Sequence, residues 1–147
     1  MKIFIGADHR GFEDKKLIVD YLKSLGHEVV DLGDNRLNPN DDFPLYATKV
    51  AEQVLMTPGS RGILLCGSGQ GMVMAANRFK GIRASICSDS ADAHSSRNDD
   101  DANVLCLSAD KLNWPNMEAI ISVWLNTDFA GAPRFIRRIE ELDKLGG

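Results

Sequence analysis

Cys66 is the residue in this chain whose type and position best suit chemistry. It ends an apolar run over residues 62–66, and the segment Gly67-Ser68-Gly69-Gln70-Gly71 follows it directly. Glycines let backbone N–H groups turn toward a ligand, and the helix expected next points its positive end the same way. Such a setting can expose a thiolate beside donors that would bind an oxyanion. The alternative is that Cys66 has no chemical role and is only a small apolar strand residue, as we interpret Cys87 and Cys106.

Asp8 and His9, followed by Arg10, form an ionisable cluster directly after the first apolar run. Such a cluster at the mouth of a sheet is a candidate for proton transfer or for binding a polar ligand. The alternative is structural: Asp8 could cap the helix that begins near Phe12, with His9 merely exposed.

Arg134 and Arg138 are four residues apart and therefore share one face of a helix near the C-terminus. Guanidinium groups match phosphate oxygens well, so this pair could bind an anion. The alternative is a solvated helix with intrahelical pairs such as Arg137 with Glu141.

The elements that must position these residues alternate along the chain. Apolar runs predict strands near residues 3–5, 29–32, 62–66, 82–87 and 104–107. Apolar residues at helical spacing, or polar stretches after a strand, predict helices near residues 17–25, 44–57, 72–79, 90–99, 117–125 and 135–142. Five such repeats predict an α/β fold with a five-stranded parallel sheet, helices on both faces and a C-terminal helical extension. Ligands in such folds bind beyond the carboxyl ends of the strands.

Length and composition exclude several classes of protein. The 147 residues fit a single domain over residues 1–147, and we expect the methionines and tryptophans on its helices in the core. The net charge of −4 argues against a nucleic-acid partner, and no apolar run reaches the roughly 18 residues of a membrane span. We see no signal peptide, and three cysteines do not make a disulfide framework, so we expect a cytoplasmic protein. CxxC and HExxH patterns are absent, which gives metal binding no support.

Several segments together resemble the RpiB/LacA/LacB family of sugar-phosphate isomerases, and the likeness covers nearly the whole chain. The segments are Gly6-Ala7-Asp8-His9-Arg10-Gly11, Asp42-Phe43-Pro44-Leu45-Tyr46-Ala47, Cys66-Gly67-Ser68-Gly69-Gln70-Gly71, Ala75-Ala76-Asn77-Arg78, Gly81-Ile82-Arg83, Asn103-Val104-Leu105 and the tail with Arg134 and Arg138. The resemblance implies a Rossmann-like three-layer αβα domain without metal or organic cofactor. It also implies a homodimer with active sites at the subunit interface, and it leaves open whether two dimers pair.

The resemblance further implies reversible exchange of ribose 5-phosphate and ribulose 5-phosphate, a step of the pentose phosphate pathway. Cys66 would take the C2 proton and return it at C1, because Met72 stands where a second branch of the family has a Glu base. Backbone amides of Gly67, Gly69 and Gly71 would hold the enediolate oxyanion, and Ser68 would relay a proton between sugar oxygens. The remaining implied roles are phosphate binding by His9, Arg134 and Arg138, and substrate binding by Asp100. Asp8 would bind sugar hydroxyls or orient His9.

One position departs from the family pattern. Asp99 stands where the family commonly has a His that opens the cyclic sugar, and an ordinary Asp is a poor proton donor at neutral pH. Asp99 could serve as the ring-opening base, or solvent or His94 could take over that step. The substrate could also be a different one, such as galactose or allose 6-phosphate. A non-catalytic sugar-phosphate-binding relative is the alternative from another class. A nucleotide-dependent Rossmann enzyme is disfavoured, because its glycine fingerprint would follow the first strand.

Overall fold

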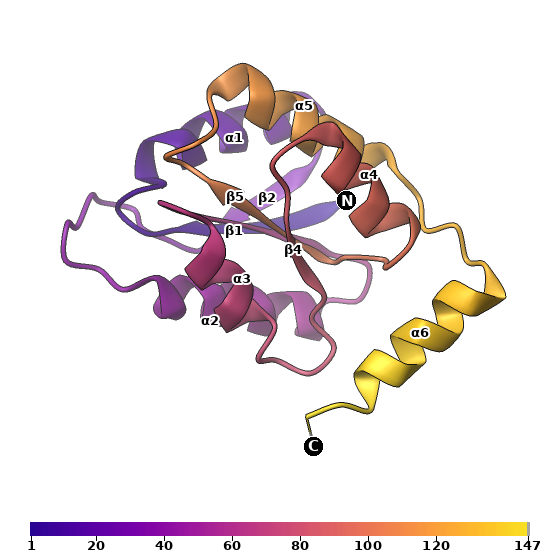
Figure 1. The fold of residues 1–147 in the computed structure, drawn as a ribbon. Helices are drawn as coiled ribbons and strands as arrows, with labels where there is room; N and C mark the ends of the chain where they lie inside the picture. The colour runs from indigo at the N-terminus through magenta and orange to yellow at the C-terminus, as the bar shows by residue number, and fades with distance from the viewer. Residues whose placement is uncertain (147) are drawn as a thin grey trace.

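The computed structural model describes residues 1–146, in which strands and helices alternate along the chain (Figure 1). The strands are β1 (Lys2–Ala7), β2 (Glu28–Asp31), β3 (Arg61–Cys66), β4 (Ala84–Ile86) and β5 (Val104–Ser108). The helices are α1 (Phe12–Ser24), α2 (Phe43–Met56), α3 (Gln70–Ala76), α4 (Ser90–Asn98), α5 (Trp114–Asn126) and α6 (Pro133–Asp143). The predicted succession of elements is therefore confirmed.

The five strands form one parallel sheet in the order β2-β1-β3-β5-β4. Figure 1 shows α1, α4 and α5 on one face of this sheet and α2 and α3 on the other, so the predicted α/β three-layer fold is confirmed. After β2 the chain crosses β1 to form β3, so the strand order reverses between these neighbours. That reversal marks the carboxyl ends of β1 and β3 as the place where a ligand crevice is expected.

Alternate residues of the central strands pack into two apolar layers. Ile63 and Leu65 of β3 face α1 and α5, while Leu64 and Cys66 face α2 and α3. This alternation explains why β3 reads as a continuous apolar run, because both of its faces are covered. Trp124 is fully buried in the first layer, as expected for a core residue.

The predicted boundaries are wrong around residues 77–83. Helix α3 ends at Ala76 and does not reach Phe79, and β4 begins only at Ala84. The Asn77 side chain accepts a hydrogen bond from Ala84 N and donates one to Ala84 O, which ties the end of the helix to the start of the strand. The expectation of a core position is also wrong for Met56 and Met74, which lie on the outward faces of their helices.

Helix α6 extends away from the rest of the molecule (Figure 1). Among residues 1–146, no side chain of α6 is buried. Even the apolar side chains of Ile136 and Leu142 are 44% and 50% exposed. Among residues 1–146, no helix combines the length and the apolar character that crossing a bilayer requires.

Candidate functional site

Cys66 occupies the last position of β3, beside the residues that follow β1. Ala7 pairs with Leu65 across the sheet, so Asp8 and Cys66 come next on neighbouring strands. Cys66 is 5% exposed, and its Sγ accepts a hydrogen bond of 3.2 Å from the backbone N–H of Gly69. The glycine-rich turn therefore directs a main-chain donor at the sulfur.

The other two cysteines differ from Cys66 in their surroundings. Burial raises the pKa of Cys87 and of Cys106, and neither lies in the glycine-rich turn. Both are buried and form no disulfide. Cys106 is a strand residue of β5, as the sequence predicted, whereas Cys87 lies one residue beyond the end of β4, so the strand prediction is wrong for it.

The glycine-rich turn after Cys66 depends on the absence of side chains at particular positions. Gly69 has a φ of +78°, and a Cβ on it would lie 2.8 Å from the Ile86 side chain. A Cβ on Gly71 would lie 2.7 Å from the ring of Phe43. Ser68 is exposed in the same turn, and its Oγ accepts from Gln70 N at 3.2 Å. The turn therefore presents backbone donors and one hydroxyl at the end of β3.

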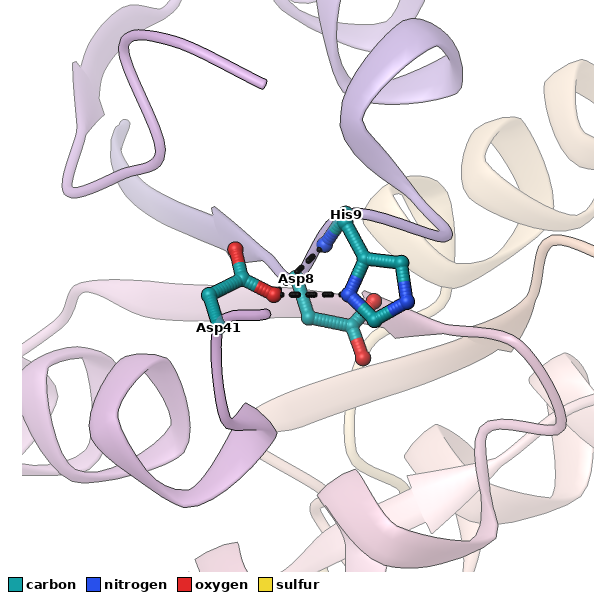
Figure 2. A group of neighbouring side chains, drawn as sticks. All are labelled: Asp8, His9 and Asp41. Carbon is teal, nitrogen blue, oxygen red and sulfur yellow. Dashed lines mark hydrogen bonds and ion pairs between the residues drawn. The ribbon is translucent and has the colours of Figure 1, made fainter. Parts of the chain in front are cut away.

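Asp8 and His9 lie at the end of β1, and Figure 2 shows them together with Asp41, which precedes α2. Asp41 Oδ1 accepts hydrogen bonds from His9 N at 2.9 Å and from His9 Nδ1 at 2.8 Å. Tyr46 also donates its hydroxyl to Asp41 Oδ2 at 3.2 Å. Desolvation alone would raise the pKa of Asp41, but these hydrogen bonds lower it below its ordinary value. Asp41 therefore fixes the His9 ring, and Nε2, which makes no hydrogen bond within residues 1–146, can face a ligand.

Sequence reasoning missed Asp41, because residues 34–42 read only as a polar loop. The available signal was the general rule that the segment after β2 reaches the same edge of the sheet as the segment after β1. The capping interpretation of Asp8 is wrong: Gly11 is the N-cap of α1, and Asp8 Oδ1 accepts instead from Arg10 N at 2.9 Å. Burial raises the pKa of Asp8.

Ligand atoms of Asp8, His9 and Asp41 lie within 4.8 Å of one another, which is close enough to consider a metal ion. The hydrogen bond between His9 Nδ1 and Asp41 accounts for that closeness, because it uses the nitrogen that would face the cluster. We therefore assign no metal to these residues.

Asp99, Asp100, Arg134 and Arg138 form a second group at the opposite edge of the sheet. Asp99 follows the last residue of α4, where Asn98 Nδ2 donates to its Oδ1 at 2.8 Å. Desolvation and the neighbouring Asp99 raise the pKa of Asp100, while the charge of Arg138 on α6 opposes that rise. Arg134 and Arg138 are exposed, and a cavity of about 650 Å³ lies between the end of α6 and the body, lined partly by Asp100.

The two groups do not meet within one chain. Cys66 pairs with Ser108 at the carboxyl end of β5, whereas Asp99 and Asp100 precede Val104 at its amino end. Four strand steps separate the two ends, about 13 Å at roughly 3.3 Å a residue. Figure 1 likewise shows α6 far from the start of α3. One protomer therefore offers two half-sites: a carboxyl-edge half with Cys66, and an amino-edge half with the tail arginines.

Comparison with known proteins shows a matching family over nearly the whole chain. The sequence profile of the family described as Ribose/Galactose Isomerase matches residues 3–142. The probable ribose-5-phosphate isomerase B of Mycoplasma pneumoniae is 41% identical over 140 residues, which cover 95% of this chain and 91% of that protein.

Solved structures agree over the same length. The ribose-5-phosphate isomerase B of Mycoplasma genitalium, solved with bound ribulose 5-phosphate, has a TM-score of 0.93 and 40% identity, covering 97% of this chain and 93% of its own. The ribose 5-phosphate isomerase of Thermotoga maritima has a TM-score of 0.94 and 39% identity, covering 98% of each chain.

Proposed function

The chain belongs to the ribose/galactose isomerase family, and on that premise we propose that it interconverts ribose 5-phosphate and ribulose 5-phosphate at Cys66. The observation that carries the proposal is the Cys66 sulfur held by Gly69 N beside Asp8, in the fold of a relative that binds ribulose 5-phosphate. Residues 1–147 would act as one isomerase domain.

The chemistry follows from the carboxyl-edge half-site. The Cys66 thiolate takes the C2 proton of the open-chain aldose and returns it at C1, so the carbonyl moves from C1 to C2. The intermediate enediolate carries charge on oxygen, and backbone amides of Gly67, Gly69 and Gly71 would bind that charge. Preorganised donors of this kind usually contribute the largest part of catalysis. Ser68, exposed in the same turn, relays the proton between the two sugar oxygens.

We propose a homodimer in which each site combines the carboxyl-edge half of one protomer with the amino-edge half of the other. The length of β5, about 13 Å, which lies between these halves within one chain, supports the proposal. The apolar face of α6 supports it independently, because exposed Ile136 and Leu142 form a surface of the kind that partners cover. Arg134 and Arg138 would then bind the substrate phosphate with His9.

Binding the phosphate end orients the reacting end of the sugar. A sugar phosphate held by its non-reacting group meets the Cys66 sulfur in a fixed geometry, which lowers the entropic part of the barrier. Asp8 binds sugar hydroxyls, and its buried position beside Cys66 supports that role. Asp99 and Asp100 reach the same ligand from the partner subunit, Asp99 as the ring-opening base and Asp100 as a sugar ligand.

The three unpaired cysteines support a reducing compartment, because an oxidised Cys66 could not act as a base. We therefore propose a cytoplasmic enzyme of the pentose phosphate pathway.

A turnover panel tests the proposed function. Purified protein is assayed with ribose 5-phosphate, ribulose 5-phosphate, galactose 6-phosphate and allose 6-phosphate, with Cys66→Ala as the control. We expect turnover of the pentose phosphates, reduced on the order of 100-fold or more in Cys66→Ala. Preference for a hexose phosphate would move the proposal to the galactose or allose reaction. Binding without any turnover would instead favour a non-catalytic relative.

A further inference from the structure

Arg10 and Asp110 form an ion pair that crosses the end of the strand carrying Cys66. Arg10 follows β1 and Asp110 follows β5, and these two strands flank β3 in the sheet. The Arg10 guanidinium donates to Asp110 Oδ2 at 2.5 Å. The pair therefore lies over the carboxyl end of β3, where the proposed reaction takes place.

The ion pair lies directly on the first residue of the glycine-rich turn. A Cβ on Gly67 would lie 3.0 Å from Asp110 Oδ2 and 3.3 Å from Arg10 Cζ. Backbone hydrogen bonds anchor both partners there, because Arg10 N donates to Asp8 Oδ1 at 2.9 Å and Asp110 N donates to Gly67 O at 3.0 Å. Two residues with proposed catalytic or binding roles, Asp8 and Gly67, thus hold the pair in place.

The Arg10 guanidinium keeps most of its donors free. It has five N–H groups, and within residues 1–146 its side chain makes a hydrogen bond only to Asp110. The side chains of Arg10 and Asp110 are 53% and 45% exposed, so the pair is open to solvent and to a ligand. An ion pair this exposed contributes little to stability, and a dianion can compete with the Asp110 carboxylate for the guanidinium.

The side chains around Cys66 are mostly negatively charged, which favours a cationic residue such as Arg10 at this place. Three carboxylates, those of Asp8, Asp41 and Asp110, lie at the carboxyl ends of the strands or just beyond them. A sugar phosphate carries close to two negative charges. His9 already uses one ring nitrogen on Asp41, so Arg10 is the side chain at Gly67 that can offset these carboxylates and meet the substrate with a guanidinium fork.

We propose that Arg10 is a substrate-binding residue that contacts the phosphate of the sugar from the same protomer as Cys66, and that Asp110 restrains it when no substrate is bound. The proposal rests on the proposed function for the identity of the sugar phosphate. Arg10 then binds the phosphate from one protomer, while the arginines of α6 bind it from the other. Because Asp110 competes with the phosphate for Arg10, the affinity for phosphate depends on Asp110.

Titration with inorganic phosphate tests this role without requiring turnover. We expect Arg10→Ala to weaken phosphate binding measured by calorimetry, and to raise the KM for ribose 5-phosphate, by roughly ten- to a hundredfold with kcat little changed. Arg10→Lys should recover part of the affinity, because it keeps the charge and loses the fork. Asp110→Asn should tighten phosphate binding roughly two- to tenfold, because it removes the competing carboxylate.

The matched control is Lys2→Ala, which removes another exposed ion pair, Lys2 with Glu28, at the amino end of β1. We expect this variant to bind phosphate like the wild type. If Arg10 and Asp110 only tie β1 to β5, then Arg10→Ala and Asp110→Asn will lower the melting temperature alike and leave phosphate affinity and KM unchanged. That result overturns the proposal. A wild-type protein that binds phosphate through Arg10 but does not isomerise ribose 5-phosphate overturns the proposed function alone.

Discussion

Mixed dimers of two inactive variants should regain activity if the site is shared between subunits. The first variant is Cys66→Ala, which removes the base. The second is the double variant Arg134→Ala/Arg138→Ala, which removes the phosphate-binding arginines of α6. In a mixed dimer, one site then combines an intact Cys66 with the intact arginines of the other chain, while the second site lacks both.

The expected magnitudes follow from the geometry. Loss of two charge-assisted phosphate contacts costs about 3–6 kcal/mol, so the arginine variant alone should lose roughly two to four orders of magnitude in kcat/KM. A mixed dimer with one complete site should show about half of the activity of the wild-type dimer. The length of β5, about 13 Å, which lies between the two half-sites of a chain, is the structural reason for this expectation.

The assay uses two affinity tags on coexpressed chains, so that only mixed dimers are purified and measured with ribose 5-phosphate. The control pairs a Cys66→Ala chain with a Ser68→Ala chain, so that both chains are altered in the carboxyl-edge half-site. No mixed site is then complete, and activity should stay low. Activity of the first mixture no higher than the sum of its parents would refute a shared site.

Three further predictions concern individual carboxylates. Asp41→Ala should destabilise the protein by about 1–3 kcal/mol, because it leaves His9 without its partner. Folding lowers the pKa of Asp41, so its ionised form stabilises the protein above pH ~4, and that stabilisation is lost as the pH falls through the folded pKa. The melting temperature of the variant should therefore change less with pH below pH ~4 than that of the wild type. Asp8→Asn should lose activity yet keep or gain melting temperature at pH 7, because the raised pKa means that ionised Asp8 costs stability there; a fall in melting temperature would contradict this. Asp99→Asn should slow turnover of cyclic ribose 5-phosphate by on the order of tenfold or more, with a smaller effect on open-chain ribulose 5-phosphate; equal rates in both directions, unchanged from wild type, would remove Asp99 from ring opening.

Local patterns in the sequence were enough to predict the elements of the fold. The apolar run that ends at Cys66 predicts a strand covered on both faces, and the glycines after it predict a tight turn. The boundary near Asn77 was not predictable, because the side chain that ends α3 binds Ala84, seven residues away and in another element. A tertiary contact overrode the apolar spacing that favours a longer helix.

The rule that ligands bind beyond strand ends located Asp8, His9 and Cys66 correctly at one edge of the sheet. The same rule covers the segment after β2, but no residue type there singled out Asp41, whose partner His9 lies 32 residues away. No local pattern indicated the contact of Arg10 with Asp110, 100 residues away. Residue types alone also could not reveal that the predicted site is divided, because that depends on the direction in which α4 and α6 run relative to the sheet.

Proton transfer at Cys66 can be measured directly by running the reaction in D₂O. Magnetic resonance would follow deuterium entering C1 of ribulose 5-phosphate and C2 of ribose 5-phosphate, in the wild-type protein and in Cys66→Ser. We predict rapid incorporation by the wild type, and incorporation by Cys66→Ser slower by on the order of 100-fold or more while the sugar phosphate still binds. Exchange at the wild-type rate in Cys66→Ser would show that another group moves the proton, and would contradict the role assigned to the sulfur.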